Sequence, residues 1–124
     1  MTTDSAFIAS ADATLAAIGS ALDAALAGYE NEDDDQADSG TDWRLNDGIL
    51  EIECADGSKV IVNRHVPNRE IWVAARSGGF HFRADGGVWR DTRSGLDLAA
   101  QLTRILREQA GLTVDLALVP GPAA

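Results

Sequence analysis

The chain has 124 residues, which is enough for one domain of ordinary size and too few for two. Apolar residues make up 45% of the sequence, a share that excludes wholesale disorder. No apolar run approaches the roughly 20 residues that a transmembrane helix needs, so no membrane span is predicted. Cys54 is the single cysteine, which excludes an internal disulfide and is typical of a reducing compartment. The first residues resemble neither a secretory signal nor a transit peptide, and we therefore expect a cytoplasmic protein.

Charge is distributed unevenly along the sequence. Twenty acids against ten bases give a net charge of −10. Residues 1–62 contain 14 acids and two bases, whereas residues 63–124 contain six acids and eight arginines. A polyanionic half repels phosphate backbones, because nucleic-acid affinity comes mainly from Lys and Arg. The charge therefore argues against nucleic acid as a partner and favours cations and basic protein surfaces.

The first predicted element is a helix over residues 4–29. Apolar residues recur along it at steps of three and four positions, from Ile8 to Tyr29, and form one stripe. Asp4 is placed to accept the free N–H groups at the helix start. Residues 30–42 contain seven acids, no base and no large apolar residue. We expect them to form a solvated, mobile loop.

The apolar period changes to two between residues 43 and 90, which is typical of strands with one wet face. The clearest alternation is that of Leu50, Ile52 and Cys54 with two glutamates between them. Glycine-containing turns separate the later strands at residues 56–57, 77–79 and 85–87. Short strands at this spacing predict an antiparallel meander.

A second helix is predicted after Ser94, whose spacing to Asp97 is that of a capping box with Asp in place of Glu or Gln. This helix is expected to end near Gly111. Its apolar face consists of Leu98, Leu102, Ile105 and Leu106. Residues 116–124 end in Pro-Gly-Pro-Ala-Ala and are expected to form a loose tail, so that the domain spans residues 1–115.

The order helix, five or six antiparallel strands, helix predicts an α+β fold in two layers. Two amphipathic helices pack on one face of a single sheet, as a two-layer α/β sandwich. The other face stays in water and carries the alternate residues of the strands. These residues are Glu51, Glu53, Lys59, Ile61, Asn63, Trp72, Ala74, His81 and Arg83.

Carboxylates are concentrated in and around the predicted loop. Such hard oxygen ligands suit Ca²⁺, Mg²⁺, Mn²⁺ and iron. An EF-hand is excluded because, counted from Asp33, the sixth position is Asp38 where glycine is required. The pattern indicates weak, exchangeable metal binding, and the alternative is a solvated loop that only increases solubility. The candidate ligands are Asp23, Glu30, Glu32, Asp33, Asp34, Asp35, Asp38 and Asp42.

Trp72 alternates with two aliphatic neighbours, which places its indole on the wet face of the sheet. Exposed aromatic rings with a polar handle are typical of protein interfaces. The alternative is a phase error of one residue, which would bury the ring. His65 and His81 lack a second histidine at ligand spacing, and we expect them to be surface residues without a role. Cys54 is expected to be a small buried hydrophobe.

Catalytic signatures are missing from the sequence. No glycine loop that leads into a helix is present to hold phosphate. Neither Ser58 nor Ser94 lies in a G-x-S-x-G turn. Acids in a wet loop lack the burial that separates the pKa values of a catalytic pair. We therefore predict that the protein is not an enzyme.

An ordered set of short motifs resembles bacterial frataxins of the CyaY type, from about Asp4 to Asp115. The set is more specific than any single motif in the chain, and its helix–sheet–helix order agrees with the elements predicted above. Its members are Asn46-Asp47-Gly48-Ile49-Leu50, Asp56-Gly57-Ser58-Lys59-Val60-Ile61-Val62-Asn63-Arg64, Pro67, Ile71-Trp72-Val73-Ala74, Gly78-Gly79-Phe80-His81-Phe82, Trp89 and Asp91-Thr92-Arg93-Ser94-Gly95.

The resemblance implies a small non-catalytic protein of iron–sulfur cluster assembly. It implies weak, exchangeable binding of Fe²⁺ or Fe³⁺ by an acidic ridge, which corresponds here to Asp23, Asp42 and the loop acids between them. It also implies docking on the cysteine desulfurase and the scaffold protein, with iron delivery or regulation of sulfur transfer. Asn63, Arg64 and Trp72 would belong to the sheet face used against partners. The expected state is a monomer, or oligomers that depend on iron.

Two other functions fit the residues. One is an acidic interaction protein that inhibits or tunes a basic enzyme and handles no metal. The other is a ferroxidase, which iron-oxidation turnover above the buffer rate would distinguish. In each case the localised negative charge would steer a basic partner and make its binding depend on salt.

Overall fold

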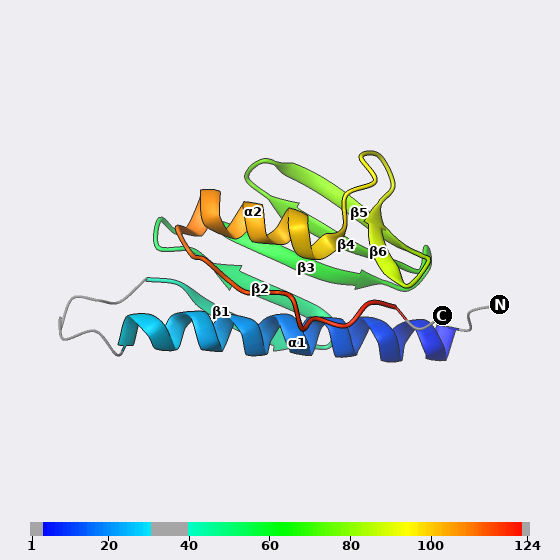
Figure 1. The fold of residues 1–124 in the computed structure, drawn as a ribbon, viewed down its shortest axis with the longest axis horizontal. Coiled ribbons are helices and arrows are strands. Elements are labelled where there is room, and N and C mark those ends of the chain that lie inside the picture. The colour runs from blue at the N-terminus through cyan, green and yellow to red at the C-terminus, as the bar shows by residue number, and fades with distance from the viewer. Residues whose placement is uncertain (1–3, 31–39, 123–124) are drawn as a thin grey trace.

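The computed structural model describes residues 4–30 and 40–122 of the chain. Its six strands form one sheet in the order β1-β2-β3-β4-β5-β6, and every neighbouring pair is antiparallel. Figure 1 shows this meander with both helices on the same side, which confirms the predicted α+β fold in two layers. The elements are α1 (Asp4–Glu30), β1 (Asp42–Asn46), β2 (Ile49–Glu53), β3 (Lys59–His65), β4 (Glu70–Ala75), β5 (Gly78–Asp85), β6 (Val88–Asp91) and α2 (Leu98–Ala110).

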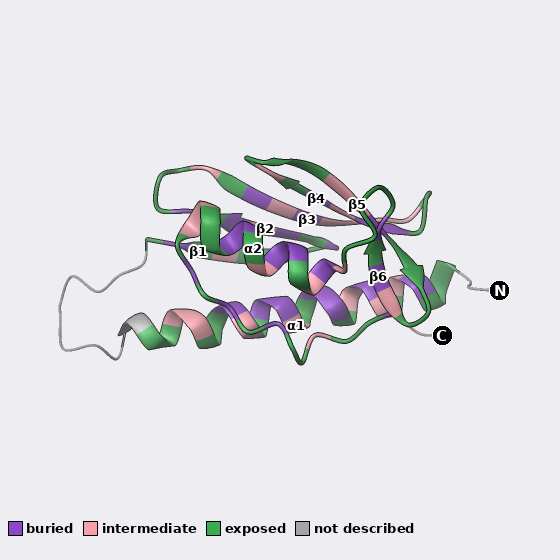
Figure 2. Ribbon diagram, turned by 45° about the horizontal axis from the view of Figure 1, so that its top comes forward, coloured by how far each residue is buried: buried purple, intermediate pink, exposed green. Residues whose placement is uncertain are grey.

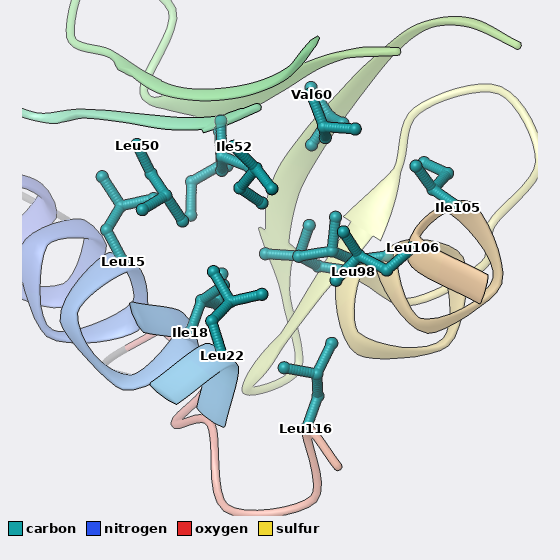
Figure 3. Close-up of a cluster of buried hydrophobic side chains, with 14 of the residues drawn as sticks. Leu15, Ile18, Leu22, Leu50, Ile52, Val60, Leu98, Ile105, Leu106 and Leu116 are labelled. Atoms are coloured by element: carbon teal, nitrogen blue, oxygen red, sulfur yellow. The ribbon is translucent and has the colours of Figure 1, made fainter. Parts of the chain in front are cut away.

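The hydrophobic core lies between the helices and the covered face of the sheet. Figure 3 shows Leu15 and Ile18 of α1 directed toward Leu50 and Ile52 of β2, with Leu106 of α2 completing the cluster. All five side chains are at most 3% exposed. Along the strands, buried residues alternate with exposed or half-buried ones, as Figure 2 shows. The sheet therefore has one covered face and one face without a helix, which we call the open face.

The apolar stripe of α1 begins one residue earlier than the sequence pattern indicates. Phe7 is buried and packs edge-on against Trp89, with ring centroids 6.0 Å apart, while Ile8 is half-buried. Among the described helices, α1 is long and apolar enough to cross a membrane by composition, with a mean hydropathy of 1.4. The expectation that no such segment exists was based only on continuous apolar runs. The many alanines of α1 raise its mean hydropathy although it contains no long continuous apolar run. In the structure the stripe of α1 packs on the sheet.

The N-terminus of α2 is capped one turn later than Ser94. The N-cap is Asp97, whose carboxylate accepts a hydrogen bond from the Ala100 N–H at 2.6 Å. Ser94 instead bonds within the preceding turn, where it donates to Asp91 and accepts from the Leu96 N–H. The helix ends at Gly111, which adopts the left-handed conformation as a C-cap.

The segment after α2 is packed against the rest of the fold, although a loose tail is expected from residue 116. Figure 1 shows it running back along α1 between the two helices, toward the N-terminal end of α1. Leu116 is buried in the core, and Thr14 donates a hydrogen bond to the Pro120 carbonyl at 3.0 Å. The same hydroxyl accepts from the Trp89 indole N–H at 3.0 Å. Apolar residues at 112, 114 and 116 give the segment a buried side that its terminal Pro-Gly-Pro composition obscured.

Gly121 tests how far this packing stabilises the fold. A Cβ added at Gly121 would overlap the carbonyl of Gly87, so Gly121→Ala should displace the segment and lower the free energy of unfolding by about 1–3 kcal/mol. Gly28→Ala is the control, because no described atom beyond the adjoining residues of α1 lies within 4 Å of the added Cβ and alanine favours the helix by about 0.5–1 kcal/mol. Urea denaturation measures both variants. Equal stability changes of the same sign would contradict the packed segment.

Asp56 connects the β2–β3 turn to the β4–β5 turn. Its carboxylate accepts hydrogen bonds from the Ser58 hydroxyl at 2.6 Å and the Ser58 N–H at 2.9 Å, and it pairs with Arg76. The Ser58 bonds and then the Arg76 guanidinium lower the pKa of Asp56 to about 2. Gln109 of α2 accepts from the Arg76 N–H and donates to Ser58, which joins the helix to both turns.

Because the pKa of Asp56 is lower in the folded state than in the unfolded state, the stability of the fold depends on pH. Because an unfolded aspartate titrates at about pH 3.9, the stabilisation by Asp56 is complete above that pH and is lost as the pH falls toward 2. Asp56→Asn should therefore be less stable than the wild type at neutral pH and show a smaller loss between pH 4 and 2. Urea midpoints measured across this range test the expectation. Parallel pH profiles for the two proteins would contradict it.

Candidate functional site

The candidate metal ligands fall partly within the described residues. Asp23 is exposed on α1, Glu30 is the last residue of α1, and Asp42 is the first residue of β1. The other candidates lie outside the described residues, and the mobility predicted for residues 30–42 lies mostly outside them as well. They are Glu32, Asp33, Asp34, Asp35 and Asp38.

Trp43 connects Asp23 and Asp42. Its indole N–H donates to Oδ1 of Asp23 at 2.9 Å, and its backbone N–H donates to Oδ1 of Asp42 at 2.9 Å. Gly19 permits this contact, because a Cβ there would lie 2.7 Å from an indole carbon of Trp43. The lack of a side chain at Gly19 therefore places the later part of α1 beside the start of β1.

Glu53 is a third acid at this edge, and the sequence analysis missed it as a site residue. The β1–β2 register pairs Asp42 directly with Glu53, and both side chains are exposed. Like charges directly opposite one another destabilise a sheet. The alternation of Glu53 with Ile52 showed only that it is on the wet face. Its proximity to Asp42 depends on the hairpin register, which the two-residue Asp47-Gly48 turn between Asn46 and Ile49 sets. That turn was the available signal.

Ion pairs neutralise most of the other acids in the first half of the chain. The described pairs are Asp4 with Arg69, Asp12 and Asp47 with Arg64, Glu51 with Arg44 and Lys59, and Asp56 with Arg76. Among the acids of this half whose side chains the structure describes, only Asp23, Asp42 and Glu53 form no ion pair with a basic side chain. We call these three residues the acidic edge, since they surround the edge strand β1.

The acidic edge offers oxygen donors without a prearranged coordination site. Within residues 4–30 and 40–122, no group of three or more His, Cys, Asp or Glu side chains is arranged to hold a metal ion. Asp42 and Glu53 lie on the open face of β1 and β2, whereas Asp23 approaches β1 from the helix side. Such donors suit hard cations, but their separation favours weak and exchangeable binding over a rigid centre.

Trp72 lies on the open face of β4, as its alternation predicts, and is half-buried there. Its indole is stacked between the imidazoles of His65 and His81, at centroid distances of 3.6 and 4.3 Å and interplanar angles of 8°. Asn63 is its cross-strand partner on β3 and is also half-buried. The histidines that the sequence analysis left without a role thus contact the residue that it singled out.

Glu70 is buried on the open face beneath these rings, with 3% of its surface exposed. Burial raises the pKa of this carboxyl, but hydrogen bonds from Trp72 and Arg83 and the nearby charges outweigh burial and hold the pKa below its ordinary value. Trp72 Nε1 donates to one oxygen at 2.9 Å, and Arg83 donates to the other at 2.7 and 3.1 Å. The alternation of β4 did not predict this burial, because residue 70 has the phase of the wet face.

Arg64 does not share the open face with Asn63 and Trp72, which corrects the expected partner surface. Adjacent residues of a strand point to opposite faces, so Arg64 lies on the covered face of the sheet and Asn63 lies on the open face. The Arg64 guanidinium pairs with Asp12 of α1 and lies 3.5 Å from Asp47 in the β1–β2 turn. Its side chain is 19% exposed, and it joins the helix layer to the sheet.

Comparisons with known proteins agree with the fold and the motifs. The family model described as a frataxin-like domain matches residues 1–112. Two curated relatives, both named iron-sulfur cluster assembly protein CyaY, come from Dechloromonas aromatica and Cupriavidus metallidurans. They are 47% and 42% identical to this chain, cover 91% of it in each case, and are themselves covered to 97% and 95%.

A solved frataxin from Psychromonas ingrahamii, studied as a model within the CyaY protein family, has the same architecture. It superposes with a TM-score of 0.71 at 26% sequence identity, and the match covers 93% of this chain and 98% of the frataxin. The helix–meander–helix fold, the motifs along the strands and these relatives together show that the chain belongs to the frataxin-like (CyaY) family.

Proposed function

We propose that this protein is a non-catalytic adaptor of iron–sulfur cluster assembly in the bacterial cytoplasm. It binds iron weakly as cargo, docks on the cysteine desulfurase and scaffold complex, and delivers iron to that complex or regulates it. The relatives named iron-sulfur cluster assembly protein support the process. The acidic edge and the open face are the surfaces that support the two binding activities.

The observation that carries the proposal is the position of the unpaired acids. Asp23 and Asp42 lie near the two ends of the acidic sequence 30–42, and Glu53 faces Asp42 across the β1–β2 ladder. Acids elsewhere in the first half are neutralised by bases within the fold. Within the first half of the chain, the negative charge that remains available to a cation or a basic surface is therefore concentrated beside one edge strand.

This arrangement accounts for weak binding and ready release. Exposed carboxylates keep their hydration until a cation or a guanidinium approaches, so each contact contributes little, about 0–1 kcal/mol. Several such contacts attract Fe²⁺ without enclosing it, and the cargo can pass to a site with better ligands. The same field raises the association rate of a basic partner more than it lowers the dissociation rate.

Iron binding can be mapped with Fe²⁺, whose unpaired electrons broaden nearby amide signals. We expect broadening around residues 23, 42 and 53 and in the intervening acidic sequence. Glu53→Gln should weaken binding about two- to fivefold, because it removes an unpaired carboxylate. Glu51→Gln is the matched control on the same face, since Glu51 is already paired with Arg44 and Lys59 and should change the affinity less.

The outcome of this titration also separates the main alternative. An acidic interaction protein that handles no metal is favoured by the lack of a three-ligand group among the described residues. It predicts weak, uniform broadening and equal effects of the two glutamate variants. Either result would remove iron from the proposed function while leaving the docking activity to be tested separately.

Docking on the desulfurase can be tested through the acidic sequence. Reversal of Asp33, Asp34 and Asp35 to Lys should slow association at low salt and flatten its salt dependence, because the steering charge is removed. A single reversal, Asp34→Lys, has a matched control in Glu108→Lys. The control makes the same charge change on α2, at a residue paired with Arg104. Stopped-flow association rates measure the effect. An unchanged rate for the triple variant at low salt would refute docking through this segment.

A further inference from the structure

The indole of Trp72 is covered on both of its flat sides by the protein itself. His65 lies 3.6 Å from one side and His81 lies 4.3 Å from the other, measured between ring centroids. Each imidazole is parallel to the indole within 8°. A partner on the open face therefore cannot stack on the indole and meets the edge of its ring. The sequence pattern, which placed Trp72 on the wet face, did not show this restriction.

Three adjacent strands fix the two imidazoles relative to the indole. His81 on β5 is the direct cross-strand partner of Trp72 on β4. His65 on β3 pairs with Glu70, two residues before Trp72, which makes it a diagonal neighbour within reach of an aromatic ring. The backbone ladder thus determines the stack. Among the described atoms, Nδ1 of His65 is buried and has no hydrogen-bond partner, so stacking on Trp72 and not a hydrogen bond of Nδ1 orients this ring.

The imidazoles limit tilting of the indole, and Glu70 limits its rotation within the plane of the ring. Its Oε1 accepts from Trp72 Nε1 at 2.9 Å, while Arg83 holds Oε2. His81 Nδ1 is 3.9 Å from the same carboxylate. A buried carboxylate is unfavourable unless it is paired and hydrogen-bonded, and here those bonds come from the tryptophan and its surroundings. The indole N–H is therefore used inside the protein and is not free for a partner.

We propose that His65 and His81 are positioning residues for docking: they hold the Trp72 indole in one orientation before a partner binds the open face. This inference rests on the proposed docking function, for which it names how Trp72 acts. An anchor that is already ordered loses little side-chain entropy on binding, so the complex dissociates more slowly. The two histidines contribute through the order of Trp72, whose exposed edge makes the contact with the desulfurase–scaffold complex.

The order of the indole can be measured without any partner, from ¹⁵N relaxation of the Trp72 side-chain N–H. In the wild type we expect an order parameter of about 0.8 or more, and in His81→Ala and His65→Ala a value below about 0.6. Phe in place of either histidine should restore the order, because it keeps a flat ring without an ionisable group. Ile61→Ala is the control, since Ile61 lies on the same face but pairs with Ala74 and Glu51.

Binding to the purified desulfurase–scaffold complex of the source bacterium supplies the second readout. We expect the two Ala variants to dissociate about three- to tenfold faster, the two Phe variants to dissociate like the wild type, and association rates to change little. Trp72→Ala shows how much the dissociation rate changes when the indole is removed altogether. Thermal unfolding confirms that each variant is folded at the temperature of the measurement.

Each result decides the inference. The positioning role of the histidines would be overturned by a mobile indole in the wild type or by an unchanged order parameter in the Ala variants. It would also be overturned if the Phe variants failed to restore the order parameter. Lower order with an unchanged dissociation rate would overturn its role in docking. If the wild type does not bind the complex at all, the proposed function fails, whereas the relaxation data still show whether the histidines position Trp72.

Discussion

Burial of one face of the sheet beneath α1, α2 and the C-terminal segment is the constraint on which the rest of the structure depends. Because side chains alternate along each strand, covering one face leaves the opposite residues in contact with solvent. Arg64 and Asn63 are neighbours in sequence and serve different layers for this reason: the first joins the sheet to α1 and the second lies beside Trp72. The six-stranded meander thus separates residues that stabilise the fold from residues that are available for binding.

The same arrangement redistributes the charge of the chain. The acids of the first half are numerous, but bases on the strands and turns neutralise those that lie on or beside the sheet, such as Asp12 and Glu51. What remains is the acidic edge, where Asp42 and Glu53 oppose one another across the β1–β2 ladder. Lys59 on β3 is the other cross-strand neighbour of Glu53, but its ion pair is with Glu51. Repulsion of this kind destabilises the free protein, and a bound cation or guanidinium would relieve it.

The sequence predicted the fold closely because each of its signals was local. The strand period and the glycine turns placed the meander, and the α2 face from Leu98 to Leu106 is buried as predicted. The candidate site was less predictable, because its contacts are not local. The pairing of Asp42 with Glu53 follows from the register that the Asp47-Gly48 turn sets, but it requires the two strands to be considered together. The stack around Trp72 requires His65 and His81 from two other strands. Segment 116–122 was misjudged because its composition is that of a tail, whereas its contacts with Thr14 and the core come from distant parts of the chain.

A structure of the protein bound to the desulfurase–scaffold complex, determined by cryo-electron microscopy, is the most direct test of this account. We expect the acidic edge to lie within ion-pair distance of basic side chains on the complex. We also expect the edge of the Trp72 indole to be buried in the interface, while α2 and the C-terminal segment remain exposed to solvent. A complex in which the outer side of α2 contacts the partner and the open face stays free would contradict it.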